Sequence, residues 1–419
     1  MQNIVDELKY RGLIKDFSNE EEVRKLLDTP QTIYCGFDPS ASSMHLGNFV
    51  MISMLMRLQK AGHRIIALVG GATGMIGDPS GKSKERNFLD KDALKNNTEC
   101  IKNQLERFID LTDPKKGLIL NNYEWISKLS VLDYLREYGK LFPVNYMLSK
   151  DIVASRLQSG VSYSEFSYMI LQSIDFLHLY KNEGCHLQIG GGDQWGNLTS
   201  GLELIRKSEG NDTLVGCFTV PLLLDSNGKK FGKSEGGALY LDAKLVSPYK
   251  LYQFLINSTD DDAARYLKIF SFKTIGEIEA IIKEHYEHLG SRIAQKALAY
   301  EVVSLIHGKE KADEAINMSN ALFSGEFKSL SEQNILELFQ DFKVNVQSNM
   351  LLEDLLIAIN GASSKREARE FIKGNSVSLN GEKVNDLEKH INKNDTLFDK
   401  YIVVKRGKKN YYLVELLDE

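Results

Sequence analysis

Residues 32–60 form a strand–loop–helix pattern that constrains the fold more than any other part of the chain. Residues 32–37 are a short apolar run typical of a buried strand, and residues 49–60 are rich in Met and Leu, which indicates a helix. His45 and Asn48 fall on the first turn of that helix, where unpaired backbone N–H groups favour phosphate. Taken alone, the pattern is better explained by an ordinary turn in which His45 only caps the helix.

A second joint of the same kind predicts the architecture. Residues 64–69 are a continuous apolar run, typical of a parallel strand buried on both faces. Residues 185–189 form another strand, and the glycine-rich stretch 190–197 leads into a helix through Arg206. A further strand is expected at 218–224. Two such joints predict two halves of a doubly wound parallel sheet in an α/β chain, with a ligand at the carboxyl ends of the strands.

The helix predicted over 164–180 is apolar almost all round but carries one polar stripe. Tyr168, Gln172 and Asp175 are spaced i, i+4 and i+7, so they share one face. Buried polar groups need hydrogen-bond partners. We favour a bound polar small molecule as that partner, slightly ahead of neighbouring loops.

Two other loops carry glycines and cations. Residues 77–83 resemble a P-loop, but the required first glycine falls at Ile76, so the spacing fails by one. Lys82 and Arg86, further along, are candidates to reach phosphates. Residues 229–234 place lysines on both sides of a glycine and are either a mobile cationic loop or a solvated basic turn.

The last block, 351–419, reads as a separate small α/β unit. Ser364 and Glu367 have the spacing of a capping box for a helix that ends at Gly374. An Asn-Gly turn predicts a hairpin over 377–384. Two basic clusters favour RNA over a solvated face. They comprise Lys365, Arg366, Arg369 and Lys373 on the helix, and Lys405, Arg406, Lys408 and Lys409 near a second hairpin turn.

Composition and charge exclude several classes of protein. The chain has 419 residues and a formal net charge of -5, so contact with nucleic acid must come from local patches. Its 4 cysteines form no CxxC pair, which favours a reduced, cytoplasmic chain without structural zinc. No apolar run approaches the roughly 20 residues of a membrane helix.

With both loops in view, the chain resembles the bacterial-type tyrosyl-tRNA synthetases, a family of class I aminoacyl-tRNA synthetases. Residues 45–48 match the first family signature and residues 230–234 the second. The tyrosyl branch is indicated by residues 34–39, 191–197 and 234–237. Asn48 stands where the first signature ends in histidine, and Phe231-Gly232 replace its usual Met-Ser in the second.

The resemblance implies a fold and four segments. These are a Rossmann-like catalytic domain at 1–225, the cationic loop with a helical anticodon-side domain at 226–325, a linker at 326–350, and a small α+β, S4-like RNA-binding domain at 351–419.

The resemblance also implies the reaction. Tyrosine and ATP give tyrosyl-adenylate and pyrophosphate, and the tyrosyl group then passes to the 3′ end of tRNA(Tyr). The attacking carboxylate is already ionised, so this step needs compensation of phosphate charge and no general base.

Site residues carried over by the resemblance fall into three groups. The phosphates and pyrophosphate are contacted by Ser40, His45, Asn48, Lys82, Arg86, Lys230 and Lys233. The nucleotide is positioned by Asp38, Gly47, Asn48, Gly192, Asp193 and Lys233. Tyrosine is held by Tyr34 and Asp175 at its hydroxyl, by Asp78, Tyr168 and Gln172 at its ammonium, and by Gln188 and Gln194 nearby.

The implied partners are L-tyrosine, ATP with Mg²⁺, tRNA(Tyr) and a second copy of the chain. Mg²⁺ is expected to bridge phosphate oxygens and not to sit in a protein cage. Three alternatives stay open. They are a related enzyme specific for tryptophan, a non-catalytic RNA-binding protein built on a decayed synthetase, and a P-loop kinase-like protein, which the glycine spacing disfavours.

Overall fold

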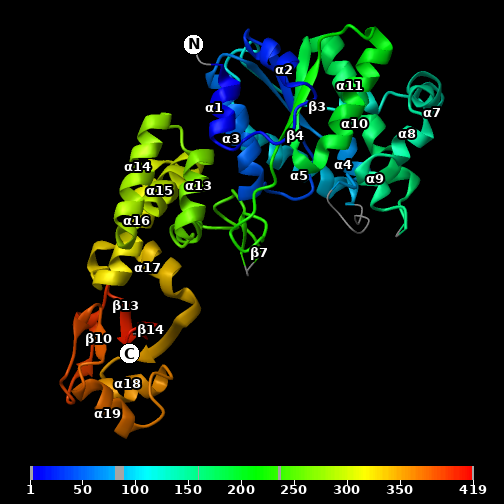
Figure 1. The fold of residues 1–419 in the computed structure, drawn as a ribbon. Coiled ribbons are helices and arrows are strands. Elements are labelled where there is room, and N and C mark those ends of the chain that lie inside the picture. The colour runs from blue at the N-terminus through cyan, green and yellow to red at the C-terminus, as the bar shows by residue number, and fades with distance from the viewer. Residues whose placement is uncertain (1–2, 81–88, 159, 235–236, 418–419) are drawn as a thin grey trace. The chain divides into compact units, whose positions relative to one another are not determined.

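The computed structural model describes four stretches of the chain: residues 3–80, 89–158, 160–234 and 237–417. They divide into two compact units (Figure 1). The first unit comprises 1–247 and 254–302, and the second comprises 248–253 and 303–419. Each unit has its own five-stranded sheet.

A parallel sheet forms the centre of the first unit. Its strands are β1 (Thr32–Phe37), β2 (Arg64–Val69), β3 (Gly117–Asn121), β4 (Cys185–Gly191) and β5 (Gly216–Val220). They lie in the order β3-β2-β1-β4-β5, and each neighbouring pair is parallel. The chain starts in the middle, winds to one edge and returns to the other, which confirms the doubly wound prediction. The winding reverses between β1 and β4, and this places the binding crevice at their carboxyl ends.

Two strands differ from expectation. The sequence analysis does not identify β3, which is short and begins with a glycine. The strand expected at 218–224 ends at Val220, because Pro221 follows and cannot donate a hydrogen bond to a sheet.

Helices connect these strands and cover the sheet (Figure 1). The first unit contains α1 (Ile4–Tyr10), α2 (Glu20–Leu27), α3 (Leu46–Lys60), α4 (Thr73–Ile76), α5 (Lys91–Leu105), α6 (Tyr123–Ile126), α7 (Val131–Asp133), α8 (Val144–Leu148), α9 (Asp151–Ala154), α10 (Tyr163–Glu183) and α11 (Trp195–Glu209). Helices α10 and α11 share a core with the sheet. That core includes Ile66, Leu68, Phe176, Leu198 and Leu202. The apolar faces of these two helices are therefore used for packing, which leaves the polar groups of α10 to face the crevice.

The remainder of the first unit follows β5. A two-stranded antiparallel ribbon comprises β6 (Lys233–Ser234) and β7 (Gly237–Ala238). Helices α13 (Asp260–Phe270) and α14 (Ile275–Glu287) come next. Helices α12 (Pro248–Ile256) and α15 (Ile293–His307) contribute residues to both units. The segment 226–325 is helical as expected, but most of α12–α15 clusters with the first unit.

The second unit combines four further helices with a mixed sheet. The helices are α16 (Lys309–Ser324), α17 (Glu332–Phe339), α18 (Leu352–Ala358) and α19 (Lys365–Lys373). The sheet order is β11-β10-β13-β14-β8, with β8 (Lys343–Gln347), β10 (Val377–Leu379), β11 (Glu382–Lys383), β13 (Tyr401–Arg406) and β14 (Asn410–Leu417). The short strands β9 (Met350–Leu351) and β12 (His390–Ile391) pair separately. Both expected hairpins form, and Asn380 and Gly381 have the positive φ of the Asn-Gly turn.

The expected linker at 326–350 is structured. It holds α17 and β8, and β8 pairs in parallel with β14. Phe327, Ile335 and Phe339 pack with Val403 and Leu413 of the C-terminal strands. The polar residues of β8 lie on its outer face, which is why this stretch looks like a linker in sequence. The C-terminal unit thus begins well before residue 351.

None of the helices within the described ranges is long and apolar enough to span a membrane.

Candidate active site

The first turn of α3 carries His45 as its N-cap. The Nδ1 atom of His45 accepts a hydrogen bond from the Asn48 N–H at 3.2 Å, and Asn48 Oδ1 accepts from the His45 N–H at 3.0 Å. Burial and the positive charge of Lys233 lower the pKa of His45. The imidazole is therefore neutral at physiological pH, and with Nδ1 accepting, its Nε2–H is left to donate. Capping and ligand binding use different nitrogens of one ring, so both roles considered for His45 are compatible.

The cationic loop lies across this same turn. Leu46 N–H donates to Leu239 O at 2.7 Å, just beyond the loop. Gly232 has a φ of +78°, and a Cβ placed on it would lie 2.8 Å from the backbone nitrogen of Gly47. Only glycine fits such an approach. The two signature segments therefore meet in space, although His45 and Lys230 are 185 positions apart in the sequence. His45, Lys230 and Lys233 line one cavity of about 590 Å³.

Phe231 anchors the loop from the other side. Its side chain is buried, and its ring lies 4.5 Å from that of Tyr266 and 5.4 Å from that of Phe270, between ring centres. This packing accounts for an aromatic residue where the family signature has methionine. The Phe231 side chain attaches the loop to α13, and the flanking Lys230 and Lys233 line the cavity.

The deep end of the cavity is built around Asp175 of α10. Its carboxylate accepts from Asn122 Nδ2 at 2.9 Å and from Trp125 Nε1 at 2.8 Å. Burial raises the pKa of Asp175 to about 7, although these two hydrogen bonds oppose the rise. Tyr34 is 1% exposed, and its hydroxyl has no hydrogen-bond partner among the described residues. Burial, followed by the charge of Asp175, raises the pKa of Tyr34, so the phenol stays protonated.

A hydrogen-bonded network links this end to the middle of the cavity. Tyr168 Oη donates to Asp38 Oδ2 at 2.8 Å, and Thr73 Oγ1 donates to Asp38 Oδ1 at 2.8 Å. Asn122 Nδ2, which reaches Asp175, is also 3.0 Å from Thr73 Oγ1. Tyr168 and Asp38, expected to serve different substrates, are thus joined directly.

A second carboxylate cluster lies at the carboxyl end of β4. Gln194 Nε2 donates to Asp78 Oδ2, and Asn197 Nδ2 lies 3.0 Å from Gln194 Oε1. Burial and the nearby charge of Asp78 raise the pKa of Asp193, while Lys230 and Lys15 oppose that rise. The cavity therefore offers acidic and amide groups on one side and lysines at its mouth, which suits a ligand with both an ammonium and a phosphate chain.

Most of the expected site residues line this one cavity: Tyr34, Asp38, Ser40, His45, Gly47, Asn48, Asp78, Tyr168, Gln172, Asp175, Gly192, Asp193, Gln194, Lys230 and Lys233. Gln188 does not line it. Its Oε1 lies 3.2 Å from where a Cβ on Gly201 of α11 would stand, and it has no hydrogen-bond partner among the described residues. Lys82 and Arg86 lie outside the described residues.

Three residues of the network were missed by the sequence analysis: Thr73, Asn122 and Trp125. Asn122 directly follows β3, so its position at the carboxyl end of a parallel strand was the available signal. That signal was lost because β3 itself was not identified. Nothing in the sequence distinguishes Trp125 from a core aromatic residue.

The expected RNA face belongs to the second unit and divides into two parts. On α19, Lys365 lies 2.6 Å from Asp354, and Arg369 donates to Glu353 at 3.0 Å. Arg366 lies 3.3 Å from Glu370. Near the second hairpin the cations face rings or solvent instead. Lys405 lies over Tyr411 and Arg406 over Phe371, whereas Lys408 and Lys409 are exposed at the turn. The positive potential of α19 is therefore reduced by paired carboxylates, and the hairpin tip carries the more available charge.

Comparison with known proteins matches two stretches of the chain to described families. Residues 27–324 match the family described as tRNA synthetases class I (W and Y), and residues 334–414 match the tyrosine--tRNA ligase SYY-like C-terminal domain. The chain is 48% identical over 419 residues to tyrosine--tRNA ligase 1 of Bacillus subtilis, covering 99% of each chain. It is 46% identical over 415 residues to tyrosine--tRNA ligase of Listeria monocytogenes, covering 98% of this chain and 99% of the other.

A solved structure agrees in fold. A C-terminally truncated mitochondrial tyrosyl-tRNA synthetase of Aspergillus nidulans superimposes with a TM-score of 0.70 at 32% identity, over 77% of this chain and 95% of that one.

Proposed function

The chain belongs to the class I tRNA synthetases of the tryptophan and tyrosine family, and from this premise we propose how its residues act as a tyrosine--tRNA ligase. The reaction joins tyrosine to tRNA(Tyr) through an adenylate made from ATP. The roles of individual side chains are the proposal.

The observation that carries the choice of tyrosine is the deep end of the cavity. The Tyr34 hydroxyl is buried and finds no hydrogen-bond partner in the part of the chain that the structure describes, and the Asp175 carboxylate lines the same cavity. A substrate phenol donates to Asp175 and accepts from Tyr34, which satisfies both groups. Phenylalanine leaves the Tyr34 hydroxyl unpaired, at a cost of roughly 1–3 kcal/mol for a buried polar group, and it brings no further donor to Asp175, which keeps its hydrogen bonds from Asn122 and Trp125. Tryptophan has no hydroxyl to offer there.

The substrate's ammonium is placed toward the carboxylates. Asp78 and Asp38 supply negative charge, and Tyr168 and Gln172 supply hydrogen-bond acceptors on the same helix face as Asp175. One face of α10 thus reads both ends of the amino acid. Gln188 acts behind this layer, since its side chain is turned to α11.

Adenylate formation is proposed to depend on positioned positive charge. The tyrosine carboxylate attacks the α-phosphorus of ATP, and negative charge grows on the phosphate oxygens and the leaving pyrophosphate. Lys230 and Lys233 neutralise that charge, while the His45 Nε2–H, the Asn48 amide and the Ser40 hydroxyl donate to the oxygens. Lys82 and Arg86 are proposed to hold the pyrophosphate. Gly47, Gly192 and Asp193 are proposed to bind the nucleotide.

Magnesium is proposed to arrive with ATP. The described residues contain no group of three or more His, Cys, Asp or Glu side chains arranged to hold a metal ion. An ion that is bound chiefly by phosphate oxygens and water fits this donor set, and it supplies further charge neutralisation.

We propose that the second unit binds tRNA through its basic residues, with the hairpin tip at Lys408 and Lys409 as the main contact. We also propose a homodimer. Large apolar side chains are exposed around α7–α9, which lie together in Figure 1. They include Val131, Leu132, Val144, Leu157 and Tyr163, each at least 50% exposed. A second copy would cover such a patch. The reaction is assigned to the cytoplasm, where its substrates occur.

The decisive experiment is ATP–pyrophosphate exchange with tyrosine, phenylalanine or tryptophan as the amino acid. Exchange with tyrosine alone is expected. Exchange with tryptophan and not tyrosine would move the assignment to the tryptophan enzymes. No exchange with any of them, together with retained tRNA binding, would favour the decayed, non-catalytic alternative.

A further inference from the structure

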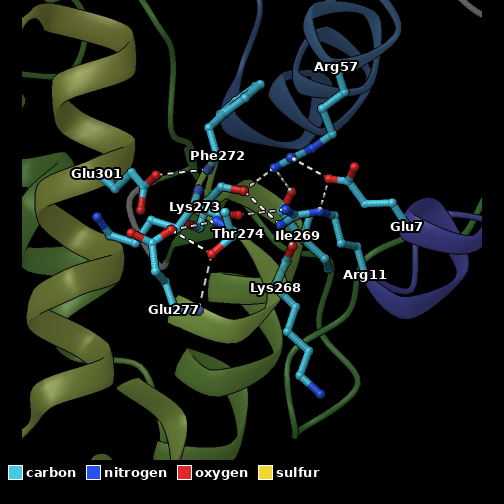
Figure 2. Close-up of polar contacts among 11 residues, drawn as sticks. Glu7, Arg11, Arg57, Lys268, Ile269, Phe272, Lys273, Thr274, Glu277 and Glu301 are labelled. Atoms are coloured by element: carbon cyan, nitrogen blue, oxygen red, sulfur yellow. Dashed lines mark hydrogen bonds and ion pairs between the residues drawn. The ribbon is translucent and has the colours of Figure 1, made fainter. Parts of the chain in front are cut away.

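Two arginines of the first unit are buried at the C-terminal end of α13 (Figure 2). Arg11 follows α1, and Arg57 lies in the last turn of α3. They expose only 3% and 4% of their surfaces. Neither residue belongs to the cavity described above. Their position at a helix end gives the first indication of what they do.

Each guanidinium group donates to one carbonyl oxygen of the last turn of α13, which a helix leaves unsatisfied, and to carbonyl oxygens of the residues just beyond the helix. Arg57 Nη2 donates to Ile269 O at 3.0 Å and also to Ser271 O. Arg11 donates at 2.8–2.9 Å to three carbonyl oxygens, those of Lys268, Ser271 and Lys273. The cations also match the partial negative charge of the helix C-terminus. The end of α13 is therefore held by side chains from α1 and α3.

The charge of this clamp is only partly balanced. Glu7 Oε1 lies 2.7 Å from Arg11 Nε and 3.7 Å from Arg57 Nη1. The Arg57 guanidinium also lies over the ring of Phe272, 4.2 Å from its centre. Burial, and then the charge of Arg11, lowers the pKa of Arg57 to about 9. The charges of Glu7 and Glu301 oppose this lowering. Burying paired charges in this way is a poor way to gain stability, which argues for a role in fixing geometry.

The same helix holds the segment that carries the loop lysines. Tyr266 Oη donates to Leu224 O at 3.2 Å, and Arg265 Nη2 donates to the same oxygen. Asp262 accepts from Ser226 N–H at 2.9 Å. Leu224 in turn pairs with Lys230 in an isolated bridge.

The aromatic contacts complete this link. The ring of Phe231 packs on Tyr266 and Phe270, and Phe270 stacks on Phe49 of α3. Helix α3 thus meets α13 both through Phe49 and through Arg57. Its first turn carries His45. A displacement of α13 relative to α3 would shift Lys230 and Lys233 relative to His45.

We propose that Arg57, with Arg11 and Glu7, is a positioning device that sets α13, and through it the Lys230–Lys233 loop, for adenylate formation. This inference rests on the proposed function of the two loop lysines. The arginines do not line the cavity in which the substrates are proposed to bind, so they are positioning residues and not catalytic ones.

The test is Arg57→Lys, which keeps the charge but loses the forked donation to two carbonyl groups. The matched control is Arg64→Lys, since Arg64 also donates to backbone carbonyls, those of Pro114 and Glu183, and neither of these belongs to α13. Single-turnover adenylate formation per titrated active site and tyrosine affinity are measured separately. Arg57→Lys should slow adenylate formation roughly 10- to 100-fold, as misplaced catalytic groups do, with tyrosine affinity unchanged. Arg64→Lys should change neither.

Combination with Lys233→Ala separates positioning from general damage. Once the lysine is absent, Arg57→Lys should slow the reaction much less than it does alone, because the two changes remove the same contribution. The positioning role of Arg57 would be refuted if the two substitutions had fully multiplicative effects on the rate of adenylate formation, or if Arg57→Lys and Arg64→Lys had equal rates. Either result would leave the proposed function of the loop lysines standing. A Lys233→Ala enzyme with normal adenylate formation would overturn the proposed loop function as well.

Should Arg57→Lys fail to fold, Tyr266→Phe decides the matter. It leaves Arg11 and Arg57 in place and removes the hydroxyl that donates to Leu224 O and accepts from Arg265 Nη2. It should slow adenylate formation, spare tyrosine affinity and be non-additive with Lys233→Ala. Normal adenylate formation by Tyr266→Phe would contradict the proposal.

Discussion

At the scale of single residues, the chemistry of the site depends on which atoms are already engaged. The Nδ1 atom of His45 accepts the hydrogen bond that caps the helix, and its Nε2–H remains to donate. The Asp175 carboxylate accepts two hydrogen bonds, yet burial raises its pKa to about 7. Tyr34 has a hydroxyl without a partner among the described residues. These states follow from burial and neighbours, and each makes a substitution informative.

Asp175→Ala should abolish most tyrosine activation while leaving ATP binding nearly intact. The carboxylate is buried whereas Lys230 and Lys233 are exposed, and its loss removes the acceptor for the substrate hydroxyl. Tyrosine affinity is measured by equilibrium dialysis and ATP affinity by the concentration dependence of adenylate formation. Equal losses of both would refute the assignment of the slot.

Asp175→Asn should alter the pH dependence of stability in the ligand-free protein. Burial raises the pKa of Asp175 from its ordinary value of 3.8 to about 7. Between these pH values the folded state holds a proton that the unfolded state has lost, so this group lowers the free energy of unfolding as pH rises. Asparagine does not titrate, and any fixed cost of a misplaced amide does not vary with pH.

The measurement for this variant is the difference in Tm, variant minus wild type, between pH 5 and pH 8. The difference should become more positive toward the higher pH. A difference that stays constant across this range would mean that the carboxyl is not perturbed in the folded protein.

At the scale of elements, the site is made where one loop crosses the start of one helix. The Phe231-Gly232 pair departs from the family signature, and the structure gives each residue a reason. Phe231 fills a position among Tyr266 and Phe270, and Gly232 passes against Gly47 with a positive φ. The position of the loop therefore depends on its contacts with α13 and with the start of α3.

Gly232→Ala should impair adenylate formation far more than tyrosine binding. The added Cβ would stand 2.8 Å from Gly47 N, so the loop or the helix start must move. Gly228→Ala is the control, because Gly228 has a similar φ of +76° but nothing within 4 Å of a Cβ. Both changes carry backbone strain of about 1–3 kcal/mol. Single-turnover rates that fall equally in both variants would show that the close approach is unimportant.

At the scale of the whole molecule, the RNA role of the second unit cannot be tested by cutting the chain at residue 351. The core that joins Phe327, Ile335 and Phe339 to Val403 and Leu413 spans that position. Such a deletion would expose apolar surface and confuse unfolding with lost RNA contact. Substitution of surface charge avoids this problem.

Replacing Lys408 and Lys409 together by alanine should weaken tRNA charging and spare ATP–pyrophosphate exchange. Two lost phosphate contacts should reduce the slope of log affinity against log salt by about 2. Lys365→Ala with Arg366→Ala should have a smaller effect, since both side chains already face carboxylates. Charging is measured as tRNA KM over a salt series. A larger effect from the α19 pair would reverse the proposed ranking.

Sequence alone determined the classes of element and the chemistry available to them. The apolar run at 64–69, the glycine joint after Ile189 and the stripe on α10 are local patterns. Local periodicity and turn chemistry are enough to predict a doubly wound sheet with a ligand at the carboxyl ends of its strands, whereas most of the expected residues of the cavity come from the resemblance. Resemblance added the reaction. The weak strand β3, and with it Asn122, escaped because a short strand of ordinary composition has no distinctive local pattern.

The tertiary structure decided what depends on contacts between distant segments. In the folded chain, the side chain of Gln188 points toward α11, and cations of α19 pair with Glu353 and Asp354. The stretch that looks like a linker contributes β8 to a sheet. Arg57 also donates hydrogen bonds at the end of α13, to residues more than two hundred positions further along the chain. Burial and hydrogen-bond partners are properties of the packed chain, so no window of sequence contains them.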